Sequence, residues 1–133
     1  YLPDFMATAV ELSGAEYPPQ LPQLVGKSLL PTLKDPQQVV HSEPIYWEHE
    51  GNAAMRIGDW KLVREYEKPW ELYDISRDRT ELNNLTDVDS VTAKSMIDNW
   101  ESWATGIGVA FPKRFSMYQF LREKQKREKS DKK

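Results

Sequence analysis

Residues 44–75 read PIYWEHEGNAAMRIGDWKLVREYEKPWELYDI, and the fold is decided in this stretch. Apolar and polar side chains alternate through it with a period of two, which is the period of a β-strand. Gly51-Asn52 and Gly58-Asp59 are turn signals, and Lys68-Pro69 interrupts the pattern. The stretch predicts an antiparallel meander of four short strands, at residues 44–50, 53–57, 60–66 and 70–75.

A helical pattern follows these strands. Thr80 is a candidate cap for a short turn, and Asp89 or Ser90 suits the start of a longer helix that reaches about Thr105. Apolar residues recur at spacings of three and four along it: Ala93, Met96, Ile97, Trp100, Trp103 and Ala104. We therefore predict an α+β fold, a four-stranded antiparallel sheet packed with a C-terminal helix.

The N-terminal part has a different pattern. Five apolar residues form a helical stripe, which ends at Gly14: Phe5, Met6, Ala9, Val10 and Leu12. An irregular, Pro-rich arm follows, with one short helical turn expected at Ser28–Leu33. We predict three parts: a helix and connector at 1–43, the sheet and helix at 44–110, and an aromatic-then-basic tail at 111–133.

Composition excludes several function classes. The chain has 133 residues, no cysteine and a formal net charge of −3. Disulfides, thiolate nucleophiles and zinc–thiolate sites are therefore excluded. No apolar run is long enough to span a bilayer, and acidic residues interrupt the basic tail, so we expect neither a membrane nor a nucleic-acid partner. The first residues lack the pattern of a signal peptide and begin as though within a larger fold, which indicates a fragment.

The candidate chemistry centres on Glu48, His49 and Glu50. On a strand the two carboxylates point away from His49, so the triplet cannot close on one metal ion, and we expect no metal site. Two interpretations of His49 stay open: an exposed edge-strand residue, or a donor that contacts a ligand near neutral pH.

The remaining candidates favour structural roles. Trp100 and Trp103 belong to the helical stripe. Three other tryptophans suit either stacking on sugar rings or packing across strands, which we favour: Trp47, Trp60 and Trp70. Three aspartates lack the spacing of a calcium-binding EF-hand loop and suit turns and caps instead: Asp59, Asp74 and Asp78.

Several motifs together resemble the C-terminal region of the type I sulfatases, in particular the bacterial arylsulfatases. They occur in the family's order over residues 1–108: LPDFMATAVELSGAEYP (2–18), GKSLLP (26–31), WEHEGN (47–52) with Arg56, GDWK (58–61), ELYD (71–74) and TELNNL (80–85). The resemblance implies a sulfuric ester hydrolase with an alkaline-phosphatase-like main domain. Its smaller C-terminal subdomain is a four-stranded sheet packed with a helix.

The resemblance also implies a formylglycine nucleophile, formed in a Cys/Ser-x-Pro-x-Arg motif, and a calcium ion held by Asp and Asn residues. This chain contains neither element. We therefore expect it to use no cofactor, to be inactive alone, and to have the N-terminal catalytic domain of the parent sulfatase as its partner. The parent's substrate is expected to be a sulfated small molecule or glycan.

His49 and Asn52, on the turn after the first strand, are the residues we expect to contact substrate at the rim. The alternative is a stand-alone binding or interaction module of the same sheet-and-helix form. We also expect the isolated fragment to self-associate, because residues 15–44 are apolar enough to need a partner surface. Family habit implies a periplasmic or secreted location.

Overall fold

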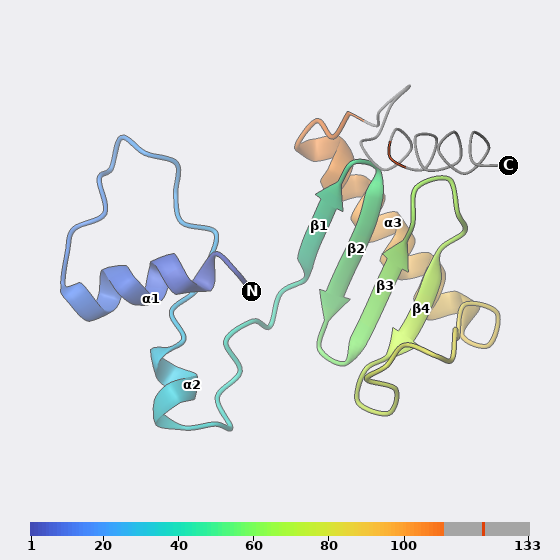
Figure 1. The fold of residues 1–133 in the computed structure, drawn as a ribbon, viewed down its shortest axis with the longest axis horizontal. Coiled ribbons are helices and arrows are strands. Elements are labelled where there is room, and N and C mark those ends of the chain that lie inside the picture. The colour runs from blue at the N-terminus through green and yellow to red at the C-terminus, as the bar shows by residue number, and fades with distance from the viewer. Residues whose placement is uncertain (111–120, 122–133) are drawn as a thin grey trace, which may run out of the picture. The chain divides into compact units, whose positions relative to one another are not determined.

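The computed structural model describes residues 1–110 and 121 (Figure 1). The chain divides into two compact units, one of Tyr1–Pro44 and one that begins at Ile45. Each unit has its own secondary structure. The predicted tail at 111–133 lies outside the described residues, apart from Leu121.

The second unit contains the predicted four-stranded antiparallel sheet. Its strands follow one another in the sheet as they do in the chain: β1 (Ile45–His49), β2 (Asn52–Ile57), β3 (Trp60–Arg64) and β4 (Glu71–Asp74). The predicted fold class is therefore confirmed. β3 and β4 are shorter than expected beside the loop that joins them, because Lys68-Pro69 interrupts the pairing there. β4 also ends at Asp74, one residue earlier than predicted.

The first hairpin turn differs from the prediction. Gly51-Asn52 was expected to form it, but Asn52 pairs with His49 as the first residue of β2, and the turn is Glu50-Gly51. Both turn residues have positive φ, 52° at Glu50 and 87° at Gly51, as a two-residue hairpin turn of the primed type requires. The predicted Gly58-Asp59 turn is confirmed, since Ile57 pairs with Trp60 across it.

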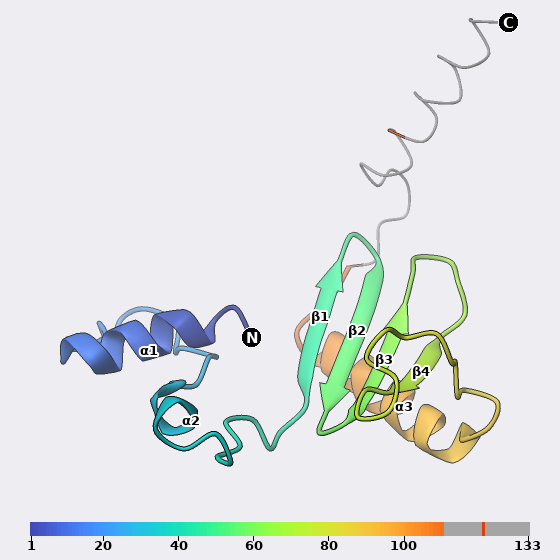
Figure 2. The same ribbon diagram turned by 60° about the horizontal axis from the view of Figure 1, so that its bottom comes forward.

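Helix α3 (Ser90–Gly106) lies across one face of the sheet (Figures 1 and 2). Asp89 caps it by accepting a hydrogen bond from the Thr92 backbone N–H at 3.1 Å. The predicted stripe faces the sheet, and its four most buried members are Ala93, Met96, Trp100 and Ala104.

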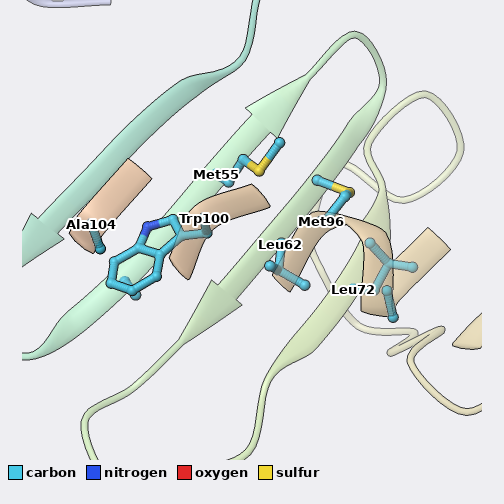
Figure 3. Close-up of a cluster of buried hydrophobic side chains, with 8 residues drawn as sticks. Met55, Leu62, Leu72, Met96, Trp100 and Ala104 are labelled. Atoms are coloured by element: carbon cyan, nitrogen blue, oxygen red, sulfur yellow. The ribbon is translucent and has the colours of Figure 1, made fainter. Parts of the chain in front are cut away.

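The core lies between α3 and the sheet (Figure 3). Met55, Leu62 and Leu72 pair across three neighbouring strands, and all three are buried on the face that α3 covers. Trp100 is fully buried above them, while Trp60, Trp70 and Trp103 pack around the cluster half-buried. Trp47 differs, because it belongs to the opposite face and is 39% exposed.

The outer edge of β4 is closed by the chain that follows it. The Leu72 backbone N–H donates to the side chains of Asn84 and Thr86, and the Leu72 carbonyl accepts from the Leu85 N–H at 2.8 Å. This pairing hides a strand edge that would otherwise be open to other chains. The TELNNL motif therefore covers the outer edge of β4.

Thr80 was expected to cap a short helical turn here, but residues 80–85 contain no helix. Asp78 organises the loop instead, and its carboxylate accepts hydrogen bonds from the backbone N–H groups of Leu82 (2.9 Å) and Asn83 (2.8 Å). An aspartate can satisfy several loop donors at once, whereas a threonine hydroxyl satisfies fewer. The expected turn role of Asp78 is confirmed.

The first unit contains α1 (Asp4–Ser13) and α2 (Leu30–Lys34), joined by the irregular arm. Helix α1 ends at Gly14, whose φ of 65° is left-handed as predicted. Among the described residues the apolar stripe of α1 is largely exposed, since Phe5 is 66% exposed, Met6 56% and Leu12 66%.

The opposite side of α1 holds the arm through polar groups. The Asp4 carboxylate, only 1% exposed, accepts the Lys27 backbone N–H at 2.9 Å and the His41 Nε2–H at 2.8 Å. The Thr8 hydroxyl accepts the Leu29 N–H at 2.9 Å. Gly26 runs so close to α1 that a Cβ there would lie 2.2 Å from the Pro3 carbonyl oxygen. We call Asp4, Thr8 and His41 the arm clamp.

Truncating the core leucine of β4 tests the sheet–helix packing. Leu72 is 0% exposed, whereas Leu82 in the edge-covering loop is 80% exposed. We expect Leu72→Ala to lower the free energy of unfolding by about 2–5 kcal/mol, because it leaves a cavity. Leu82→Ala should change it by less than about 0.5 kcal/mol. Urea denaturation measures both, and equal losses would contradict the packing described.

The arm clamp should depend on pH. Burial opposes ionisation of Asp4, but the hydrogen bonds from Lys27 and His41 outweigh it, so the pKa of Asp4 lies below its ordinary 3.8. A depressed carboxyl pKa stabilises the folded form above the ordinary pKa, and this contribution is lost as the pH falls through the folded-state value. The NMR shift of the Lys27 amide should therefore titrate with a midpoint below 3.8.

Two controls accompany that titration. In Asp4→Asn the acidic transition at Lys27 should disappear, while Glu11→Gln, on the exposed side of the same helix, should leave it unchanged. A midpoint at or above the ordinary value would show that the clamp does not favour the charged carboxylate.

Candidate functional site

The three residues of the Glu-His-Glu stretch do not converge. Glu48 lies on the α3 side of the sheet, where its Oε1 accepts the Gly51 backbone N–H at 2.8 Å. His49 is exposed on the other side, and Glu50 is part of the turn. One oxygen of Glu50, Oε2, is shielded from solvent and has no hydrogen-bond partner among the described residues. The stretch therefore forms the end of the β1–β2 hairpin.

Asn52 holds two loops together. Its Nδ2 donates to the His49 carbonyl at 2.9 Å, and its Oδ1 accepts the Tyr66 backbone N–H at 3.0 Å. Both ends of the amide are thus used in joining the β1–β2 turn to the β3–β4 loop. The predicted contacts of His49 and Asn52 with substrate stay predictions.

Within residues 1–110, no three His, Asp or Glu side chains gather as a metal site would require. No helix in the same range is long and apolar enough to cross a membrane. The acidic side chains near β4 have structural partners instead. The Tyr73 hydroxyl donates to Glu71 Oε2 at 2.9 Å, and burial with that bond raises the pKa of Tyr73 to about 12, so it is no base at neutral pH.

A pocket of about 460 Å³ opens at the end of the sheet that carries the β1–β2 turn and the β3–β4 loop. Strand β3, that loop and the C-terminal half of α3 form its walls. The described residues that line it are Arg64, Tyr66, Glu67, Lys68, Trp100, Glu101, Ala104, Thr105 and Val109. Its size falls in the range of small-ligand sites.

Exposure of the lining residues rises from the floor to the rim. Trp100 and Ala104 are buried, at 0% and 3%. Arg64, Tyr66 and Val109 are half-buried, and four polar residues at the mouth are exposed: Glu67, Lys68, Glu101 and Thr105. An apolar floor below a polar rim is typical of sites for small organic ligands.

Aromatic rings fix the position of Arg64. Its guanidinium carbon lies 4.4 Å from the ring centre of Trp70 and 5.5 Å from that of Trp100. At these distances the guanidinium group makes cation–π contacts with both rings.

The hairpin turn supports the pocket wall. A Cβ on Gly51 would lie 2.3 Å from the Tyr66 ring, so only glycine lets the turn pack this closely on Tyr66, which lines the pocket. The Asn52 bond to Tyr66 N–H fixes the same residue. Sequence reasoning missed Arg64 and Tyr66, because both fell inside a predicted strand and no local pattern connects them with α3.

No family model matches the chain. An uncharacterized sulfatase of Schizosaccharomyces pombe is 29% identical to it over an alignment of 119 residues, and the match covers 80% of this chain and 21% of that protein. The chain thus spans about a fifth of the length of the curated relative it matches.

Several solved structures also match the chain. Ps i-CgsB matches with a TM-score of 0.63 at 26% identity, over 76% of this chain and 23% of that one. Its complex with k-i-k-neocarrahexaose gives 0.66 at 24% identity, over 89% and 27%. A protein in complex with its substrate D-glucosamine-2-N,6-O-disulfate gives 0.54 at 23% identity, over 77% and 23%. The matches below 25% identity show the shared fold.

The predicted resemblance to the sulfatases is thereby confirmed. In each of these comparisons the chain matches a minor part of a much longer protein, as a subdomain does.

Substitution of Asn52 tests its role between the two loops. We expect Asn52→Ala to lower the free energy of unfolding of the second unit by about 1–3 kcal/mol, because the Tyr66 N–H and the His49 carbonyl each lose a partner. Asn52→Asp keeps the acceptor and should cost less. His49→Ala, at an exposed neighbour, serves as the control. Thermal denaturation followed by circular dichroism measures the stability of all three variants. If Asn52→Ala is as stable as the unchanged chain, Asn52 does not hold the two loops together.

Proposed function

We propose that this chain is the C-terminal subdomain of a sulfuric ester hydrolase. The observation that carries the proposal is the match of 80% of the chain to 21% of a much longer sulfatase. The resemblance of motifs along residues 1–108 to those of the sulfatases, in the family's order, supports it.

The catalytic groups of such an enzyme lie elsewhere in the polypeptide under this proposal. The chain has no cysteine, and none of its serines stands in a Ser-x-Pro-x-Arg motif, so it offers no precursor of formylglycine. Its described side chains do not fit a calcium ion, because no group of three ligands gathers. The chain is therefore inactive alone.

The uncovered stripe of α1 supports a large partner. Phe5, Met6 and Leu12 expose most of their apolar surface, and so do Val25 and Val39 in the arm. Burying such side chains stabilises a protein by roughly 25 cal/mol per Å², so exposed clusters mark contact surfaces. The catalytic domain of the same polypeptide is the proposed partner. Without it, the isolated chain is expected to self-associate, which sedimentation at several concentrations tests.

The second unit contributes its hairpin end to the substrate rim in this proposal. His49 is exposed there and can reach a ligand, while Asn52 fixes the turn that carries it. Substrates of the whole enzyme are sulfated small molecules or glycans. Export to the periplasm or the medium remains part of the proposal, on family resemblance alone.

Activity measurements test the proposal. We expect the 133-residue chain to leave 4-nitrocatechol sulfate intact and the product of the complete reading frame to hydrolyse it. In the complete protein His49→Ala should lower kcat/KM by roughly tenfold if His49 donates one hydrogen bond to substrate.

Arg79→Ala, at an exposed position of the edge-covering loop, is the matched control. Hydrolysis by the isolated chain, abolished by His49→Ala, would place a catalytic centre at the hairpin. A complete protein that hydrolyses no sulfate ester would instead favour the stand-alone binding module.

A further inference from the structure

The exposed apolar stripe of α1 carries a sulfur atom. Met6 is 56% exposed, and it lies in the stripe with Phe5 and Leu12, which are each 66% exposed. Two other methionines of the described residues belong to the core of the second unit, where Met55 is 1% exposed and Met96 5%. An oxidant in solution therefore reaches the thioether of Met6 far more readily than the other two.

The position of Met6 on α1 separates it from the contacts that hold the arm. Asp4 and Thr8 are each two residues away, and two residues turn an α-helix by about 200°, so both point to nearly the opposite side. Their hydrogen bonds to the Lys27 and Leu29 N–H groups lie on that side. A polar group on Met6 thus leaves the arm clamp in place and changes the exposed stripe.

We propose that Met6 is a redox-sensitive contact residue, whose oxidation by hydrogen peroxide prevents the α1 stripe from docking on the catalytic domain. The thioether sulfur attacks one peroxide oxygen, so that an S–O bond forms and the O–O bond breaks. Sulfur loses two electrons to the peroxide, and the displaced hydroxide takes the remaining proton and leaves as water. The product is methionine sulfoxide, which methionine sulfoxide reductases return to methionine.

The sulfoxide changes the chemistry of the contact. A methionine side chain is apolar and flexible, so it adapts to the surface that it packs against. Its sulfoxide is polar, and burying a polar group without a hydrogen bond is unfavourable. Phe5 and Leu12 beside it are hydrocarbons and offer the new oxygen no donor. The stripe is therefore suited to docking in the reduced state of the chain.

The identity of the partner rests on the proposed function. The matched proteins extend far beyond this chain, which covers between 21% and 27% of each, so under that function the same polypeptide supplies the covering surface. Selective oxidation of Met6 rests on its exposure alone. The two proposals can fail separately, because hydrolysis of a sulfate ester reports the proposed function.

Peroxide mapping tests the proposal on the 133-residue chain and on the product of the complete reading frame. Both carry Met117→Leu, because Met117 lies outside the described residues. Peptide mass spectrometry measures the rate of sulfoxide formation at each methionine. In the 133-residue chain we expect Met6 to react at least about tenfold faster than Met55 or Met96, and in the complete protein its rate should fall by a similar factor.

Sedimentation at several concentrations measures the consequence for contacts of the stripe. Peroxide treatment should weaken self-association of the 133-residue chain by about tenfold, because the stripe has become more polar. Met6→Leu keeps an apolar side chain and removes the sulfur, so its self-association should resist the same treatment. Circular dichroism checks that the helix content of both chains is unchanged.

Several results would overturn the proposal. These are equal oxidation rates at Met6 and Met55, a Met6 rate that is the same in both proteins, a chain that is monomeric before treatment, and equal self-association before and after it. An equal loss in the Met6→Leu chain would place the effect at another residue. If the complete protein protects Met6 but hydrolyses no sulfate ester, the redox-sensitive contact stands and the proposed function fails.

Discussion

The second unit depends on the packing of Trp100 between α3 and the sheet. This side chain is fully buried, and its indole N–H donates to the Trp47 carbonyl of β1 at 3.2 Å. Its ring also meets Trp70, next to β4, and Trp103, one turn along α3. One residue thus ties the helix to both edges of the sheet. It also provides the floor of the pocket and a ring near Arg64.

The first unit is organised by a different interaction. Its buried residues on α1 are Asp4 and Thr8, and its apolar stripe faces outward. Polar groups hold the arm on one side, while apolar groups on the other side are exposed. A buried carboxylate is tolerated only because a backbone N–H and a histidine ring satisfy it.

Local patterns predicted what depends on local physics. Alternation over residues 44–75 predicted the strands, and the spacing of Ala93, Met96 and Trp100 predicted the covering helix, because side-chain direction follows directly from the backbone period. The β1–β2 turn was predicted one residue too late in the chain. Glu50 adopts a positive φ there, and a glutamate in the sequence does not predict that conformation.

Interactions between distant segments could not be predicted. His41 meets Asp4 across 37 positions, and Asn52 meets Tyr66 across 14. The pocket combines β3 with the far end of α3, and neither segment is unusual by itself. The sequence offered His49 and Asn52 as polar turn residues, but only the fold shows that the Asn52 amide is engaged by two loops. Pairing of this kind is set by tertiary structure.

Under the proposed function the chain is a supporting piece of an enzyme, and the catalytic domain covers the exposed apolar stripe of α1. Complementation tests this most directly. The rest of the reading frame is expressed separately, the 133-residue chain is added, and hydrolysis of a sulfate ester is followed. We predict activity that rises with the added chain and saturates. Full activity without the chain, or no gain when it is added, would contradict the account.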